Sequence, residues 1–273
     1  MAQRRIPVLE ALYLDAAEQP VAVLAEGPAL RLRRHGVADV FAPVPRLARV
    51  VVFGPRVQLR TEALLACLQG GVPVLFLVAR GKLAGVLAPV VLPAWRRDLA
   101  ALLEAEATEA GFRRRLEDFC RAEERRAAIE TVRAERPSLA GGALADLRPA
   151  AWRAHWCGRS RQPAAAEWLL DELRGLAAAA VAEGLARGGV GPQFLARRTG
   201  GFPLPERLGA ALALRLAPLA ARRADTLTAP GTELEDARLR RVAIGLFESA
   251  SLAPERDRML SRLAWTLAGE PRL

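Results

Sequence analysis

The sequence predicts an α+β protein, with a small N-terminal β-sandwich-like domain followed by a larger all-α domain. Residues 1–90 alternate short apolar runs with Gly and Pro turn signals, which is typical of a small sandwich. From residue 93 onward, apolar side chains recur every three or four positions, as in amphipathic helices. The chain has 273 residues and is 52% hydrophobic, so it can bury a core in each part.

The first part contains six apolar segments that we expect to be strands, and a further strand near Val86. The six are residues 12–14, 21–24, 30–32, 50–53, 57–59 and 74–78. Between the last two of them we predict a short helix, with Thr61 as its N-cap and Glu62 in its first turn. Gly70 and Gly71 should end this helix.

Seven segments of the second part have helical spacing, and Gly- or Pro-containing breaks separate most of them. They are residues 95–108, 112–134, 147–156, 164–187, 205–225, 233–249 and 254–267. The change of period places a β domain at residues 1–88 and an α-helical domain at residues 89–273. The linker is expected near residues 88–93.

Composition indicates the class of partner. The net charge is +10 and the isoelectric point is about 11.1, which favours a polyanion such as nucleic acid. An arginine excess that only maintains solubility is the alternative. No apolar run approaches the roughly 20 residues that span a bilayer, so we expect a cytoplasmic protein with no membrane partner.

The cysteines are few and widely spaced. Cys67, Cys120 and Cys157 form no CxxC pair, which argues against zinc and disulfides and fits a reducing compartment. Cys157 lies near His155, but no acidic residue adjoins them to orient the imidazole. We therefore interpret Cys157 as a partly buried thiol rather than a nucleophile.

Two segments resemble a known family. Residues 49–87 read as strand, Gly, short strand, Thr-initiated helix, Gly-Gly-Val-Pro-Val, strand and Arg-Gly-Lys-Leu-x-Gly. The second segment begins at an Arg-rich turn, 159–163, and continues through Leu169-Leu170 to Phe194-Leu195. This order resembles the CRISPR-associated spacer-acquisition integrases, the Cas-one (Cas1) proteins. The resemblance implies metal-dependent DNA endonuclease or integrase chemistry, a homodimer formed through the β domains, and a partner of the Cas-two (Cas2) type.

The residues that would hold the metal differ from the family pattern. The family's ligand positions fall near Arg148, at Ala196 and at Leu214, none of which offers a ligand for a hard cation. The resemblance therefore implies a degenerate site with no metal. We expect Mg²⁺ or Mn²⁺ only if other carboxylates form a site, with Glu167 and Glu206 as weak substitutes. Surface ion pairing, as between Asp171 and Arg174, is the alternative role for acids on that helix.

Positive charge remains around the position of this site. Arg159, Arg161, Arg197 and Arg198 are the predicted contacts to double-stranded or branched DNA, and an ordinary solvated arginine face is the alternative. The sequence thus favours a catalytically impaired CRISPR adaptation protein that binds DNA as a dimer, with a Cas2-type partner or an intact integrase. An active metal-dependent enzyme with shifted carboxylates and a purely structural subunit are the two alternatives.

Overall fold

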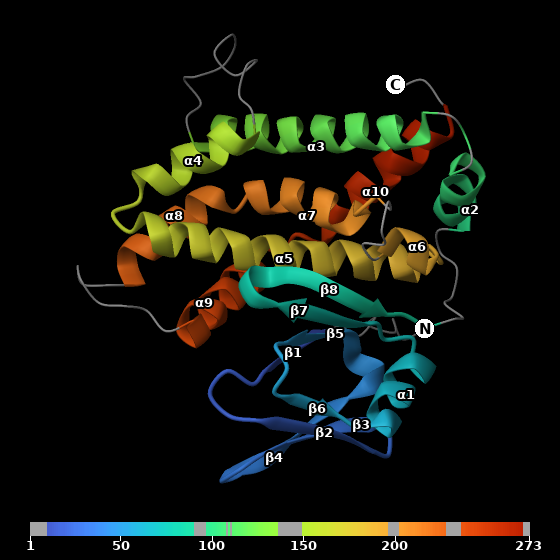
Figure 1. Cartoon of the computed structure of the whole chain (residues 1–273), viewed down its shortest axis with the longest axis vertical. Coiled ribbons are helices and arrows are strands. Elements are labelled where there is room, and N and C mark those ends of the chain that lie inside the picture. Colours follow the sequence, from blue (N-terminus) through green and yellow to red (C-terminus); the bar gives the residue numbers. More distant parts are fainter. Residues whose placement is uncertain are drawn as a thin grey trace, which may run out of the picture.

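The computed structural model describes residues 10–89, 97–107, 109, 111–135, 149–195, 202–227 and 236–269. Strands occupy the N-terminal part of this range and helices the remainder, as the sequence predicts (Figure 1). No helix among the described residues is long and apolar enough to cross a membrane. Residues 90–96, which contain most of the expected linker, lie outside the described residues, so the domain boundary stays a prediction.

Two four-stranded sheets form the β domain. The strands are β1 (Glu10–Asp15), β2 (Val21–Glu26), β3 (Ala29–Arg34), β4 (Val37–Pro43), β5 (Leu47–Phe53), β6 (Val57–Leu59), β7 (Val74–Val78) and β8 (Lys82–Leu87). The first sheet has the order β1-β5-β7-β8, with β1, β5 and β7 parallel. The second has the order β4-β3-β2-β6. Leu14, Val23 and Val50 belong to one buried cluster between the sheets, which confirms a sandwich-like core.

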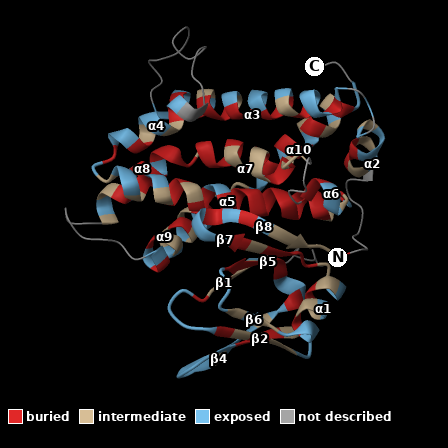
Figure 2. Ribbon diagram, viewed as in Figure 1, coloured by how far each residue is buried: buried red, intermediate tan, exposed pale blue. Residues whose placement is uncertain are grey.

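Alternation along the strands sends neighbouring side chains into different cores. Val50 and Val52 of β5 belong to the cluster between the sheets, whereas Val51 and Phe53 belong to the core of the helical part. The first sheet is therefore buried on both faces, and all seven residues of β5 are buried (Figure 2). Helix α1 (Thr61–Gln69) contributes Ala63 and Cys67 to the sandwich core.

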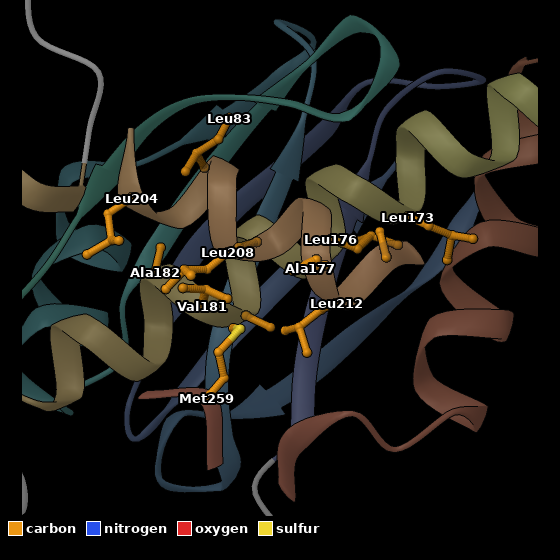
Figure 3. Packing of buried hydrophobic residues seen from close by; sticks show 14 of the residues in the cluster. Leu83, Leu173, Leu176, Ala177, Val181, Ala182, Leu204, Leu208, Leu212 and Met259 are labelled. Carbon is orange, nitrogen blue, oxygen red and sulfur yellow. The ribbon is translucent and has the colours of Figure 1, made fainter. Parts of the chain in front are cut away.

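Nine helices are described after the sheets. They are α2 (Arg97–Glu106), α3 (Phe112–Glu135), α4 (Pro149–Arg159), α5 (Pro163–Arg187), α6 (Pro192–Leu195), α7 (Leu204–Leu214), α8 (Ala217–Leu227), α9 (Asp236–Ser249) and α10 (Ala253–Leu267). The central helix is α5, which lies between the first sheet and α7 (Figure 1). Its Leu176 and Val181 pack in one cluster with Leu208 and Leu212 of α7 and Met259 of α10 (Figure 3).

A close backbone approach fixes the sheet on α5. A Cβ added at Gly175 would lie 1.8 Å from the carbonyl oxygen of Gly81, the last residue of the turn after β7. Gly81 itself has a φ of +64°, and Arg80 before it has a φ of 55°. Only glycine at position 175 allows the turn at Ala79–Gly81 to rest on the helix. The turn thereby holds Arg80 and Lys82 beside α5.

A buried ionic cluster also joins the two parts of the chain. Arg49 Nη1 of β5 donates to Glu183 Oε2 of α5 at 2.8 Å, and Arg256 Nη1 of α10 lies 3.3 Å from the same oxygen. Arg187 Nε lies 3.6 Å from Glu183 Oε1. Glu183 is 2% exposed, so its carboxylate depends on these arginines for charge compensation.

A second buried acid lies on the same helix. Glu172 is fully buried, and neither of its carboxylate oxygens has a hydrogen bond among the described residues. Arg240 Nη2 of α9 lies 3.6 Å from Glu172 Oε1, while Arg240 Nη1 pairs with Asp15 at 3.0 Å. Burial raises the pKa of Glu172 to about 7.

Several local expectations were wrong. Strand β4 was not expected. Val37, Val40 and Phe41 of this strand are all exposed, so the strand lacks the alternation of buried and exposed residues that marks a strand with one buried face. Arg60, not Thr61, is the N-cap of α1, and no side chain caps that helix end. The expected helix at 205–225 is two helices, α7 and α8, separated at residues 215–216.

Helix α4 contains two tryptophans that pack together and one cysteine with the role expected from the sequence. Trp152 is buried and Trp156 half-buried, with ring centroids 5.5 Å apart in an edge-to-face arrangement. Cys157 is 4% exposed, and burial raises the pKa of its thiol. A thiol with a raised pKa is a poor nucleophile, so Cys157 is a packing residue.

Candidate functional site

Of the three positions that should carry a metal ligand, only Leu214 lies within the described residues. Residues 148 and 196 lie outside them, as do Arg197 and Arg198. Leu214 is the last residue of α7 and is 7% exposed. It packs in a small cluster with Ala127, Ala128 and Val132 of α3 and with Trp152 of α4. The position thus carries an apolar side chain in an apolar contact.

A cavity of about 340 Å³ opens beside Leu214, and four helices line it. Its lining residues are Glu124 of α3, Arg153 of α4, Leu170 and Arg174 of α5, and Arg207, Ala210 and Leu214 of α7. Helical spacing explains the grouping, since Arg207, Ala210 and Leu214 share one face of α7. Leu170 and Arg174 likewise share one face of α5. We call this space the arginine cavity.

Positive charge predominates in the arginine cavity. Its lining contains three guanidinium groups and one carboxylate, that of Glu124. Glu124 is 8% exposed, and its pKa is raised by burial, against the opposing effect of Arg207 and Arg174. Arg153 Nη1 donates to Asp171 at 2.7 Å, and this bond raises the pKa of the guanidinium. Arg174 Nη1 lies 3.9 Å from the same Asp171 oxygen.

These residues do not suit a divalent cation. Mg²⁺ binds through several oxygen ligands, of which one or two are carboxylates, and nearby arginines oppose its charge. The arginine cavity offers one buried carboxylate among three arginines. Within the described residues, no group of three His, Cys, Asp or Glu side chains could hold a metal.

The substitute carboxylates lie in different surroundings. Glu167 is exposed on α5. Glu206 lines a second cavity of about 250 Å³ together with Asp171, Arg174, Arg80 and Lys82. This second cavity lies between the turn after β7 and helices α5 and α7, and it shares Arg174 with the arginine cavity. Asp171 forms the ion pair with Arg174 that helical spacing favours.

The arginines expected to contact DNA are only partly described. Arg159 ends α4 and Arg161 follows it in the turn before α5, and both are exposed. The Arg161 backbone N–H donates to Asp225 Oδ1 of α8 at 2.6 Å, and the Ser160 hydroxyl donates to the same oxygen at 2.7 Å. These bonds fix the turn and leave the arginine side chains at the surface.

Sequence reasoning missed Arg153 and Arg207 as site residues. Arg207 precedes Leu214 by seven positions and so had to share a helix face with it, a signal that was present in the sequence. Arg153 lies beside the buried Trp152, but nothing in the sequence indicates that α4 and α7 line one cavity. Sequence reasoning also missed the buried ionic cluster around Glu183, because two of the arginines that contact Glu183 come from β5 and α10, far away in the sequence.

Comparison with known proteins finds a family match over part of the sequence and a shared fold over nearly all of it. Residues 16–112 match the family model described as CRISPR associated protein Cas1. No curated protein sequence matches the chain significantly. Among solved structures, a Cas1 protein from Thermotoga maritima matches with a TM-score of 0.69 and 13% identity, over 96% of this chain and 98% of that one.

Two further structures share the fold. A casposase bound to integration product has a TM-score of 0.62 and 11% identity, over 97% of this chain and 92% of that one. A chain of a Cas6-RT-Cas1–Cas2 complex has a TM-score of 0.64 and 13% identity, over 98% of this chain and 36% of that one. At these identities the likeness shows the fold, while the family model matches residues 16–112 of the sequence. Residues 16–112 are thus similar in sequence to the Cas1 family of CRISPR-associated proteins, and the chain as a whole has the fold of these Cas1 structures.

Proposed function

We propose that this chain is a CRISPR adaptation protein that binds double-stranded or branched DNA without cutting or joining it. In this role it acts beside a Cas2-type partner or an intact integrase. The match of residues 16–112 to the Cas1 family model supports the adaptation role. The observation that carries the impaired chemistry is the arginine cavity, where Leu214 occupies an expected ligand position and three arginines line the space.

Two of the structural relatives support the choice of partners. One relative is bound to integration product, and another belongs to a complex that contains Cas2. The net charge of +10 agrees with a nucleic-acid partner, since neutralising phosphates is the main source of such affinity. In this proposal Arg159 and Arg161 contact the phosphate backbone, as do Arg197 and Arg198.

A homodimer through the β domains is part of the proposal. Strand β4 supports it, because it lies at the edge of its sheet and exposes Val37, Val40 and Phe41, each by more than half (Figure 2). An open strand edge with apolar side chains is a surface that another chain can cover. Sedimentation of the purified protein tests this part, with a monomer at all concentrations as the contradicting result.

Salt-dependent binding tests the DNA-binding role. We expect a fluorescent branched duplex to bind in EDTA. The logarithm of the binding constant should fall linearly with the logarithm of the salt concentration, at a slope of about −0.9 per neutralised phosphate. The double variant Arg159→Ala/Arg161→Ala should reduce that slope by about two. The matched control is Arg46→Ala/Arg241→Ala, which removes two exposed, ion-paired arginines elsewhere. Negligible, salt-insensitive binding would favour the purely structural subunit instead.

One observation favours the enzyme alternative. Glu206 and Asp171 line the same second cavity, so two carboxylates meet there although three basic side chains surround them. The other substitute carboxylate, Glu167, does not line the second cavity. Loss of a Mn²⁺-dependent activity in Glu206→Ala would establish that alternative.

A further inference from the structure

The arginine cavity contains a cationic site that the family's metal chemistry does not explain. Arg153, Arg174 and Arg207 come from three different helices and line one space of about 340 Å³. Asp171 compensates Arg153 and Arg174 from beside the cavity, at 2.7 and 3.9 Å. Arg207 has no ion pair with any described residue, and its nearest acid in the lining is the buried Glu124.

The electrostatic balance favours an anion over a cation. Counting Asp171 with the lining residues gives three positive and two negative groups. Burial raises the pKa of Glu124, which reduces the negative side further. Guanidinium groups bind phosphate oxygens through paired, charge-assisted hydrogen bonds, and Arg207 has this capacity available among the described residues.

The shape and walls of the cavity favour a phosphate that carries an organic group. Leu170, Ala210 and Leu214 form an apolar wall beside the arginines. The volume lies within the range of sites that hold small organic groups, and is generous for a bare ion. A phosphodiester with its attached sugar offers both the charge and the apolar edge.

The second cavity provides a continuation. It shares Arg174 with the arginine cavity and adds Arg80 and Lys82, so three basic side chains line it beside the acids Asp171 and Glu206. The close contact between Gly81 and Gly175 holds this turn against α5. Basic side chains therefore line two adjacent spaces from the turn after β7 to α4. A polymer with regularly spaced phosphates can use both spaces, whereas a single free phosphate occupies one.

We propose that the arginine cavity binds a DNA phosphodiester directly, through Arg207 with Arg153 and Arg174, and without a divalent cation. The guanidinium groups supply the positive charge at this place. This inference rests on the proposed DNA binding, and it adds the position, the chemistry and the metal independence of one phosphate contact.

Binding of a fluorescent branched duplex in EDTA tests the proposal. Arg207→Ala should lower affinity roughly tenfold at moderate salt, as expected for loss of a charged hydrogen bond. It should also reduce the salt slope by about one. The control Arg241→Ala removes an exposed arginine of α9 that pairs with Glu18. Equal affinities and slopes for the two variants would overturn the proposal, while the absence of binding by the unaltered protein would overturn the proposed function itself.

A second pair of variants keeps the test independent of the arginines. Ala210 lines the cavity and is half-buried, so Ala210→Glu places a negative charge there, and Ala210→Gln adds nearly the same volume without charge. We expect Ala210→Glu to weaken DNA binding at least tenfold more than Ala210→Gln. Equal effects would contradict a phosphate site. Thermal stabilisation by inorganic phosphate that depends on Arg207, with unchanged DNA affinity, would assign the site to a free anion and overturn the DNA contact.

Discussion

Replacing Glu183 by alanine is expected to destabilise the folded chain by about 3–5 kcal/mol. The change would leave Arg49 and Arg256, both less than a tenth exposed, without their shared carboxylate. Glu248 and Asp257 would remain 3.1 Å from Arg49 and Arg256, but both acids are much more exposed than Glu183 and do not replace the buried carboxylate between the two guanidinium groups. Because β5, α5 and α10 meet at this acid, unfolding should remain cooperative while its midpoint falls. Urea denaturation followed by circular dichroism measures the difference.

The matched control for this change lies on the same helix. Glu167→Ala removes an exposed acid of α5 and should alter stability by less than about 0.5 kcal/mol. A loss in Glu183→Ala no larger than in Glu167→Ala would show that the ionic cluster does not hold the β domain against the helices. An insoluble Glu183→Ala protein beside a normal Glu167→Ala protein would agree with the prediction.

Raising the pH should destabilise the protein through Glu172. Its pKa is about 7 in the folded chain, against an ordinary value of 4.5, because burial disfavours the charged carboxylate. The folded state therefore holds a proton that the unfolded chain has already released. The stabilisation of the folded state by this bound proton is complete below about pH 4.5 and is lost as the pH rises through about 7. The slope can reach about 1.4 kcal/mol per pH unit.

Glu172→Gln isolates this contribution. Glutamine keeps the shape and cannot titrate, so the stability advantage of the unaltered protein over the variant should shrink by about 2–3 kcal/mol between pH 5 and 7.5. Glu167→Gln, on the exposed side of α5, should show no such change. Parallel pH profiles for the unaltered protein and Glu172→Gln would mean that Arg240 keeps the buried carboxylate ionised throughout.

Much of the fold followed from local patterns in the sequence. Short apolar runs bounded by Gly and Pro located β2, β3, β5 and β7, and three- and four-residue spacing located α3 and α5. Strand β4 was not predicted, because its large apolar side chains are exposed and no buried face imposes an alternation of apolar and polar residues on its sequence. The break between α7 and α8 has a local signal in Pro218, which lies in the first turn of α8 and cannot sit inside a continuous helix.

The site could be predicted only in part. The apolar residue at position 214 was evident from the family resemblance, and its burial against α3 and α4 agrees with an apolar role. The convergence of Arg153, Arg174 and Arg207 could not be foreseen, because it depends on how four helices pack around one space. The environments of the acids of α5 could not be foreseen either. Glu172 and Glu183 are buried and Glu167 is exposed, and this difference depends on how the neighbouring elements pack on α5.

The most direct test of DNA binding without catalysis is a cleavage and strand-transfer assay. Purified protein is incubated with labelled branched DNA and Mn²⁺ or Mg²⁺, at concentrations where binding has been demonstrated. We expect bound DNA with neither cleaved nor joined product at any metal concentration. Metal-dependent product that disappears in Glu206→Ala or Glu167→Ala would contradict the account and show that the chain is an enzyme with a relocated site.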